Sequence, residues 1–347
     1  MKKISWFGTM LLVVILAALL VVSNAIAAPS TQMTELEKKL YEGAKKEGQI
    51  FWWDAQGLQE SAQFIKAFHE RYPGITVSYY EANAVISDEK YFIERQAGKH
   101  PVDVIHIDWY EKYKKEGCLV NMADIVRDTG YSKGLLTKDQ DAAGIEHTVK
   151  GVAYNTKLIS PKDVPRSWED LLNPKWKGRI AMDYQFEIFT FQADTWGEEK
   201  IIAYLKKLKE QNPSFNKGVT QTMTLLGAGE FSLATDASLG VVLGLQEKGI
   251  PIAFAPIGPL VGKFAPHVIV RDAPHPNSAK LFMRWLMSAE GRTLMDKVRK
   301  KGNPLPGSGT AQSKAVEQLG VQLIIAPVGL EIQGVQERFR KAVGYIK

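Results

Sequence analysis

Apolar residues recur along this 347-residue chain with two alternating periods. Leu36, Leu40 and Ala44 recur every four residues, which is typical of one face of a helix, and Gly48 stands where that helix would end. The apolar run 50–53 follows directly and predicts a short strand. Helix and strand signals then alternate through the chain, which is typical of an α/β protein.

The predicted elements form a regular series with two interruptions. Thr34 and Glu37 have capping-box spacing and mark the start of the first helix. Further elements are predicted as helices over 59–71, 198–210 and 277–287 and as strands over 75–80, 102–107, 151–156, 179–182, 233–234 and 268–270. Prolines interrupt the series at 160–174 and again at 255–266. Two such breaks indicate two lobes that exchange strands through more than one crossover.

The first 27 residues have the pattern of a secretory signal peptide. Lys2 and Lys3 precede an unbroken apolar run at 10–22, and residues 25–27 (Ala-Ile-Ala) supply the small-x-small cleavage pattern. A transmembrane anchor is the competing interpretation, but the run is shorter than the roughly 20 residues that span a bilayer. We therefore expect residues 1–27 to be removed and the mature protein to be secreted into the periplasm.

Composition narrows the class of protein. Apolar residues make up 45% and charged residues 24% of the chain, as in soluble globular proteins with a substantial core. The single cysteine, Cys118, excludes an internal disulfide framework and a cysteine-rich metal site. The net charge of +6 comes without a dense basic block, so nucleic acid is not an expected partner.

Sequence motifs that carry catalysis or bind cofactors are incomplete. His69 and Glu70 begin a zinc-protease pattern, but Pro73 stands where the second histidine belongs. Residues 258–263 resemble a phosphate-binding loop only loosely, because the spacing is one residue short. We therefore predict no catalytic residue, no metal ligand and no cofactor, and we expect that the protein is not an enzyme.

Acidic residues, most of them with an aromatic neighbour, follow four of the predicted strands. Ligands of doubly wound α/β sheets bind at the carboxyl ends of the strands, so Asp54, Asp108 and Asp236 are candidates to meet a solute in one cleft. The alternative is that each acid caps the helix that follows it. Trp53 likewise fits either a core position or a ligand contact. The candidate ligand-binding residues are Trp53, Asp54, Gln56, Asp108, Trp109, Tyr184, Gln185, Glu187, Asp236 and Ser238.

Several segments resemble one protein family, in the order in which that family has them. They are residues 62–77 (AQFIKAFHERYPGITV), 103–104, 151–158 (GVAYNTKL), 167–182 (SWEDLLNPKWKGRIAM) and 276–294 (PNSAKLFMRWLMSAEGRTL). The chain resembles the family 1 extracellular solute-binding proteins, the periplasmic components of ATP-driven importers. Within this family, the chain resembles the branch that includes binders of ferric iron, polyamines, thiamine and phosphate esters.

The resemblance implies a fold, a domain division and a partner. The implied fold is the two-lobed α/β fold of type II periplasmic binding proteins, whose lobes are joined by crossover strands and close around a small-molecule solute by hinge motion. Lobe 1 would comprise residues 28–148 and 266–310, and lobe 2 residues 149–265 and 311–347. The implied partner is an ABC permease in the inner membrane, and the protein is expected to be a monomer.

The sequence departs from the iron binders of this family at their most distinctive positions. Where they carry adjacent tyrosine ligands in the second lobe, this chain has Ala237 and Ser238, and Gly57 stands in place of a histidine that some of them contribute. The acid after the third strand is kept as Asp108. Acids and aromatic rings suit ammonium groups, so a cationic or zwitterionic organic solute of polyamine-like chemistry is expected and ferric iron is the alternative.

Two other functional classes use the same fold. An exported hydrolase would need a nucleophile with an adjacent base, or a metal ion. A sensor partner would bind solute without transport. The sequence does not separate transport from sensing, and adjacent permease and ATPase genes would favour transport.

Overall fold

The structure is a computed structural model that describes residues 32–326 and 333–345. The chain divides into residues 1–32 and a compact unit that begins at Met33, and the description below concerns that unit alone. The predicted signal peptide, residues 1–27, lies outside the described residues. Within the described ranges, no helix combines the length and the apolar character that a membrane span requires.

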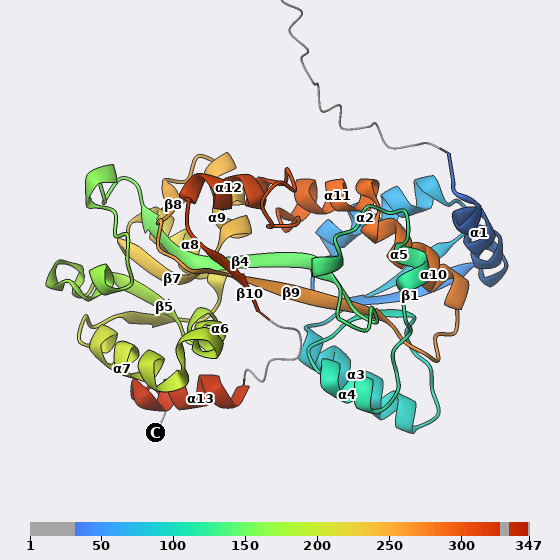
Figure 1. Ribbon diagram of the computed structural model, residues 1–347, viewed down its shortest axis with the longest axis horizontal. Coiled ribbons are helices and arrows are strands. Elements are labelled where there is room, and N and C mark those ends of the chain that lie inside the picture. The colour runs from blue at the N-terminus through green and yellow to red at the C-terminus, as the bar shows by residue number, and fades with distance from the viewer. Residues whose placement is uncertain (1–31, 327–332, 346–347) are drawn as a thin grey trace, which may run out of the picture. The chain divides into compact units, whose positions relative to one another are not determined.

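A mixed sheet of ten strands forms the centre of the described unit (Figure 1). Its order is β2-β1-β3-β9-β4-β7-β5-β6, with β10 beside β9 and β8 beside β4. β1 runs parallel to β2 and β3, whereas β9 runs antiparallel to β3 and β4. The strands are β1 (Gln49–Asp54), β2 (Thr76–Glu81), β3 (Val104–His106), β4 (Ala143–Asn155), β5 (Ile180–Asp183), β6 (Ser214–Asn216), β7 (Leu233–Ser238), β8 (Ile252–Phe254), β9 (Leu260–Ile269) and β10 (Leu323–Ile325).

Helices alternate with the strands, and the first one starts where its capping residues predict. Thr34 Oγ accepts the backbone N–H of Glu37 at 3.2 Å. The Glu37 carboxylate does not complete the capping box, because it accepts hydrogen bonds from Arg71 and Tyr72 instead. The helices are α1 (Glu35–Glu47), α2 (Leu58–Arg71), α3 (Ala84–Gln96), α4 (Tyr110–Lys115), α5 (Ala123–Val126), α6 (Glu187–Trp196), α7 (Glu198–Lys209), α8 (Val219–Ala228), α9 (Leu239–Glu247), α10 (Pro276–Met287), α11 (Ala289–Arg299), α12 (Ala311–Leu319) and α13 (Gln333–Ala342).

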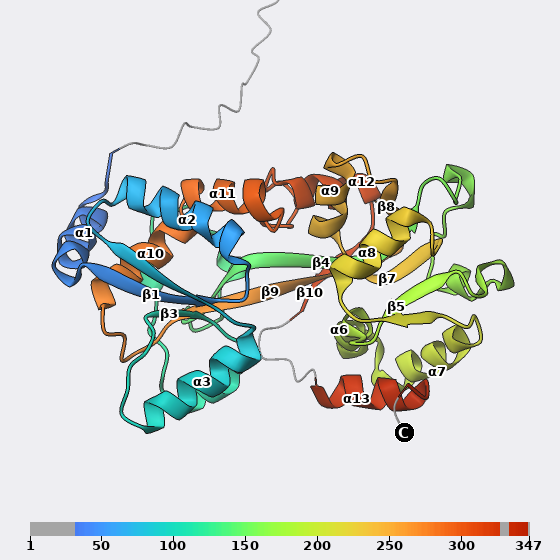
Figure 2. The ribbon, with the colours of Figure 1, turned by 180° about the vertical axis from the view of Figure 1, so that it is seen from behind.

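Neighbouring tryptophans in β1 belong to different core clusters. Trp52 packs with Phe64 of α2 and Phe282 of α10. Trp53 shares a cluster with Tyr91 of α3. Because side chains alternate along a strand, this end of the sheet is covered on both faces, by α2 and α10 on one side (Figure 2) and by α3 and α4 on the other (Figure 1).

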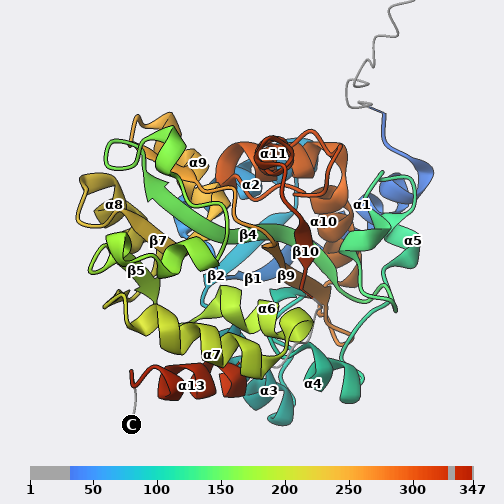
Figure 3. The same cartoon turned by 60° about the vertical axis from the view of Figure 1, so that its left-hand side comes forward.

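The other end of the sheet has its own two core clusters. One contains Phe189 of α6, Leu205 of α7 and Phe339 of α13, and α13 lies beside α7 (Figure 3). The other contains Met223 of α8 and Val242 of α9. The hydrophobic core is therefore distributed over both faces at both ends of the sheet.

Two long strands, β4 and β9, connect the ends of the sheet (Figure 1). They pair with each other over residues 143–150 and 261–267. β4 then continues along β7, and β9 continues along β3. The α/β class and the crossover strands are thus as predicted. The predicted lobe boundaries, 148/149 and 265/266, fall within these two strands and stay predictions.

Two strands are longer than the sequence pattern predicts. The predicted strand 151–156 is the second half of β4, whose first half carries Glu146 and Lys150 and so lacks an apolar run. The strand predicted at 233–234 continues to the end of β7. Asp236 therefore lies within a strand and not after it.

Candidate functional site

Charged side chains gather in two groups next to the crossover strands. Each group draws one member from β4 and one from β9: Glu146 and His267 in the first group, Lys150 and Lys263 in the second. The Asp54 cluster consists of Asp54, His106, Glu146, His267, Arg299 and Lys301, and the Glu187 cluster consists of Lys150, Asp183, Glu187, Asp236 and Lys263.

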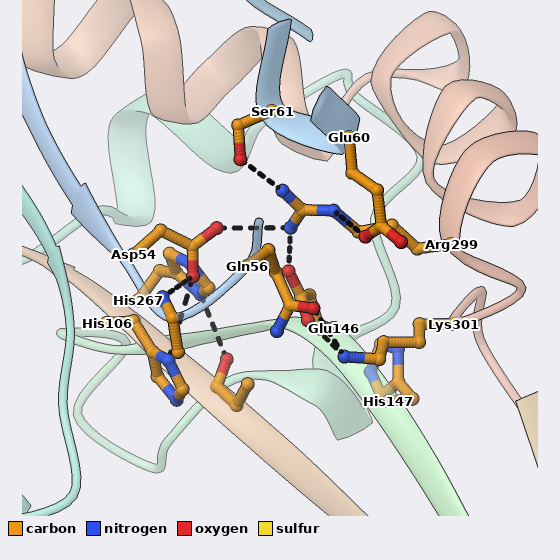
Figure 4. Close-up of polar contacts among 12 residues, drawn as sticks. Asp54, Gln56, Glu60, Ser61, His106, Glu146, His147, His267, Arg299 and Lys301 are labelled. Carbon is orange, nitrogen blue, oxygen red and sulfur yellow. Dashed lines mark hydrogen bonds and ion pairs between the residues drawn. The ribbon is translucent and has the colours of Figure 1, made fainter. Parts of the chain in front are cut away.

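The Asp54 cluster is centred on the guanidinium group of Arg299 (Figure 4). Asp54 is the last residue of β1, and Arg299 is the last residue of α11. Arg299 Nη1 donates to Asp54 Oδ2 at 3.0 Å and to Glu146 Oε1, while Nη2 donates to Ser61 Oγ at 2.9 Å. The Arg299 and Asp54 side chains are 1% and 0% exposed. Buried charges are tolerated when they are paired and hydrogen-bonded in this way.

The remaining members of the Asp54 cluster complete its electrostatics. Burial acts to raise the pKa of Asp54, but His267, Arg299 and His106 outweigh burial and hold that pKa well below its usual range. Burial lowers the pKa of His106 to about 3, so its ring is neutral at neutral pH. Lys301 Nζ donates to Glu146 Oε2 at 3.1 Å. Two carboxylates therefore face two cations.

The Glu187 cluster places one carboxylate between two lysines. Glu187 opens α6, and its oxygens lie 2.8 Å from Lys150 Nζ and 2.7 Å from Lys263 Nζ. Burial opposes the charged form of each group, but the mutual attraction prevails, so the pKa of Glu187 is well below its usual range and both lysine pKa values are raised. The Lys150 side chain is 6% exposed and that of Lys263 is 30% exposed. Lys263 is therefore the more accessible cation.

Asp236 and Asp183 extend the Glu187 cluster. Asp236 Oδ1 accepts the backbone N–H of Ile188 at 2.6 Å, and Asp183 Oδ1 accepts that of Gln185 at 2.8 Å. The second carboxylate oxygen of each is buried and has no hydrogen-bond partner among the residues described. Burial raises the pKa of Asp236 to about 7, against the opposing charge of Lys150.

The sequence matches the family of bacterial extracellular solute-binding proteins over residues 63–319. The chain belongs to this family. The predicted family resemblance and the solute-binding function at family level are thereby confirmed. Among solved structures, iron-bound HitA from Pseudomonas aeruginosa superposes with a TM-score of 0.68 at 20% identity, covering 85% of this chain and 99% of HitA. The substrate-binding protein of an ABC transporter from Agrobacterium tumefaciens gives 0.69 at 15% identity, with 85% and 94% covered. These likenesses confirm the two-lobed periplasmic-binding fold.

Curated relatives of this solute-binding protein are distant. An uncharacterized protein of Haemophilus influenzae is 27% identical over 46% of this chain, and the match spans 48% of that relative's length. Iron uptake protein A1 of Synechocystis is 23% identical, with 64% of this chain and 66% of the relative covered. A periplasmic protein of Salmonella typhi, provisionally named for binding 2-aminoethylphosphonate, is 24% identical, with 63% and 67% covered. The two relatives that are named for a solute differ in that solute.

None of the three acids proposed as helix caps is the N-cap of the helix that follows it. The N-caps of α2, α4 and α9 are Gly57, Trp109 and Ser238. Asp236 does cap a helix, but that helix is α6, which precedes it in the chain. The alternative that each acid caps the helix directly after it is therefore wrong for all three acids.

The loop after β3 presents two of the predicted ligand contacts. Asp108 is exposed, and the backbone N–H groups of Asp108 and Trp109 both donate to Asp88 Oδ2 at 2.9 Å. Asp88 is fully buried on α3, and burial raises its pKa to about 7. The Trp109 ring stacks on Phe92 at 6.3 Å. A buried acid thus fixes the backbone of this loop of the solute-binding protein.

The other predicted contacts have varied surroundings. Trp53 is 5% exposed and belongs to the core. Gln56 accepts a hydrogen bond from Lys301 at 2.9 Å. Tyr184 is half-buried, 6.2 Å from the Tyr345 ring, while Gln185 is exposed and Ser238 lies opposite Lys150 in the β4–β7 pairing. The structure brings Asp54 and Gln56 into one cluster and Glu187 and Asp236 into the other, while Lys263 interacts electrostatically with Asp108.

Sequence reasoning missed the cations and two of the acids in these clusters. Glu146 and Lys150 are four residues apart in β4, as are Lys263 and His267 in β9. Even spacing places strand residues on one face, so this polar alternation was the available signal. This signal was missed because Gly262 and Pro266 led residues 255–266 to be interpreted as an interruption between elements and not as part of a strand. Nothing in the helical pattern of α11 indicates that its last residue, Arg299, turns inward.

A separate cavity of about 500 Å³ lies near β9 and β10. Its lining includes Tyr110 and Lys114 of α4, Phe264 of β9 and Ile325 of β10. None of the ten predicted site residues is among its lining residues. This cavity and the two charged clusters are distinct features.

Proposed function

We propose that this protein is the periplasmic solute-binding component of an ABC importer and that its solute is a small organic zwitterion, with one ammonium and one oxyanion group. The family supports an extracellular binding role. The Salmonella typhi relative, named for an aminophosphonate, supports a zwitterion. The proposal narrows the cationic or zwitterionic class that the sequence predicts.

The position of Lys263 carries the proposal. Its Nζ lies 2.7 Å from Glu187, it interacts electrostatically with Asp108, and its side chain is 30% exposed. The accessible cation of Lys263 on β9 and the exposed carboxylate of Asp108 after β3 therefore attract one another electrostatically. A solute with one charge of each sign pairs with both, through a charge-assisted hydrogen bond to the lysine and an ammonium contact to Asp108.

The two charged clusters together disfavour a polyamine. A polyamine carries only positive charge and would meet Lys263 and Lys301, the more exposed lysines of the two clusters. Two of the acids that the sequence offered to it, Asp54 and Glu187, are already paired with cations of the protein. Like charges brought together in a desolvated site cost free energy, so the zwitterion fits better.

A matched ligand set tests the solute class. Thermal unfolding is followed with 2-aminoethylphosphonate, with ethylamine, with ethylphosphonate and with spermidine. Saturation at about 100 times the dissociation constant adds about 2.7 kcal/mol of stability. We expect the zwitterion to stabilise the protein more than either half-molecule. A larger effect of spermidine than of the zwitterion would overturn the proposal.

Ferric iron is the second candidate, because one relative is named for iron uptake. The place of the paired tyrosines is taken by Ala237 and Ser238, both buried in β7. We therefore expect no tyrosinate charge-transfer band when Fe(III) is added. A strong visible band would make ferric iron the favoured solute in place of the zwitterion.

We further propose that the protein acts as a monomer and without catalysis. Most charged groups of the two clusters are paired with one another, which suits a binding role better than a catalytic one. Product analysis after prolonged incubation with the bound solute tests this: recovery of the unchanged solute is expected, and a converted product would show an enzyme.

A further inference from the structure

Three side chains of the Asp54 cluster have the arrangement of a metal-ion ligand set. Asp54, Glu146 and His267 each offer a ligand atom, and these atoms all lie within 4.8 Å of one another. All three residues are at most 2% exposed. Carboxylate oxygens and an imidazole nitrogen bind ions such as Zn²⁺ at about 2 Å, so ligand atoms around one ion have separations of this order.

The guanidinium group of Arg299 lies between the two carboxylates of this set (Figure 4). It hydrogen-bonds to Asp54 Oδ2 and to Glu146 Oε1 through the same nitrogen, Nη1. We infer that Arg299 is a built-in cation that fills this ligand set and keeps metal ions out of the Asp54 cluster. The inference concerns this chain's own residues and does not depend on the proposed zwitterion.

The surroundings of Arg299 hold its guanidinium group in place. The group lies over the Phe64 ring, 4.6 Å from the ring centroid, and Ser61 accepts from Nη2. Its Nε lies 3.6 Å from Glu60 Oε2. A planar fork with several donors suits such a bridging position better than the single ammonium of lysine. The position is therefore built for arginine from several elements at once.

The charges of the Asp54 cluster also favour the exclusion of metal ions. Lys301 lies beside the second oxygen of Glu146, and burial together with the charge of Arg299 lowers the pKa of Lys301 to about 8. Asp54 and Glu146, the two acids of the ligand set, are thus each paired with a cation of the protein, and neither is left free to bind a metal ion. Removing Arg299 alone would leave a buried anionic set with a histidine beside it.

The test compares the wild-type protein with R299M and R299K, with Co²⁺ as the probe. Co²⁺ binding is measured by equilibrium dialysis and by its visible absorption. We expect no bound Co²⁺ in the wild type or in R299K, which keeps a cation. We expect about one ion per chain in R299M, and adding H267Q to R299M removes one ligand and should weaken binding at least tenfold, because even the loss of a residue that only supports a ligand has an effect of that size.

The control variant is K301M. It removes the other cation that contacts Glu146 but leaves Arg299 in place, so it should bind no Co²⁺. If R299M does not fold by circular dichroism, the variant R299M/E146Q neutralises one acid together with the cation, and it should fold and bind Co²⁺ through Asp54 and His267. A folded R299M or a folded R299M/E146Q that binds no Co²⁺ would overturn the inference. So would a wild type that binds one Co²⁺ and loses it in H267Q.

Discussion

The carboxylate of Asp236 accepts the backbone N–H of Ile188 at 2.6 Å, so an acid inside β7 caps a helix that begins 49 residues earlier at Glu187. The acid is 1% exposed and its backbone φ is +57°, in the left-handed region that few non-glycine residues adopt. Aspartate is one of the few non-glycine residues that adopt this region, because its short side chain can form a local hydrogen bond. Here the carboxylate of Asp236 fixes the start of α6 beside Glu187.

Asp236→Asn should flatten the pH dependence of stability. The pKa of Asp236 is raised to about 7 in the folded protein from an ordinary 3.8, so the folded state retains a proton that the unfolded state has lost. Its contribution to stability is complete below about pH 4 and is lost as pH rises through about 7. Asparagine keeps the helix cap and tolerates positive φ. Urea unfolding between about pH 4.5 and 7.5 should show a slope smaller by up to about 1.4 kcal/mol per pH unit.

The charged groups that face position 236 are the same in the wild type and in the Asp236→Asn variant, namely Lys150, Asp183 and Glu187. The difference between the two slopes therefore isolates position 236, although Asp88 contributes a slope of the same sign to each. Identical slopes in wild type and variant would show that Asp236 is ionised throughout this range.

Glu187→Gln should destabilise the fold strongly. The change leaves Lys150, whose side chain is 6% exposed, without its ion-pair partner. Removing one partner of a buried pair costs about 3–5 kcal/mol. Glu198→Gln is the matched control, because Glu198 also stands in the first turn of a helix but pairs with Arg338 near the surface, where a loss below about 1 kcal/mol is expected. Equal losses in the two variants, measured by urea unfolding, would contradict the burial argument.

Lys263→Met should weaken the zwitterionic solute about tenfold, which corresponds to about 1.4 kcal/mol. Glu187 keeps Lys150 as a partner, so the fold should survive. Lys300→Met serves as the control, since Lys300 pairs with Glu247, which is mostly exposed. Isothermal titration calorimetry compares the two variants. Unchanged affinity in the Lys263 variant would show that a residue other than Lys263 binds the oxyanion of the solute.

Asp88→Ala should reduce solute affinity although Asp88 is fully buried. The variant removes the acceptor of two backbone hydrogen bonds that hold the loop of Asp108 and Trp109. Asp103→Ala is a matched control, because buried Asp103 accepts the backbone N–H groups of Phe51 and His275, both at 2.7 Å. Titration of folded samples should show a loss only for the Asp88 variant. A similar loss for both would indicate a general effect of stability.

Local signals in the sequence predicted the elements whose burial follows one simple period. Trp52 and Trp53 come from an apolar run, and their alternate faces follow from strand geometry alone. The same reasoning identified the Thr34 cap. It identified the ends of β1, β3 and β5 as places where polar residues gather.

The charged clusters were beyond local reasoning, because their partners come from distant parts of the chain. Asp54 was interpreted as an acid available to a solute, yet Arg299, 245 residues away, occupies it. Glu187 was interpreted in the same way, yet Lys263 lies 76 residues away. Acids at strand ends can be read from sequence; the cations that compensate them depend on which strands cross over.

The pairing of β4 with β9 sets a length scale in this protein. Glu146 and Lys150 belong to different clusters but are four residues apart on one strand, with regular pairing to β9 between them. A strand rises about 3.3 Å per residue, so their backbones stand about 13 Å apart, and the hydrogen-bonded ladder resists stretching. Twisting of the ladder alters the angle between the clusters while their spacing stays constant. A molecule that contacts both clusters must therefore be long enough to cover this constant separation.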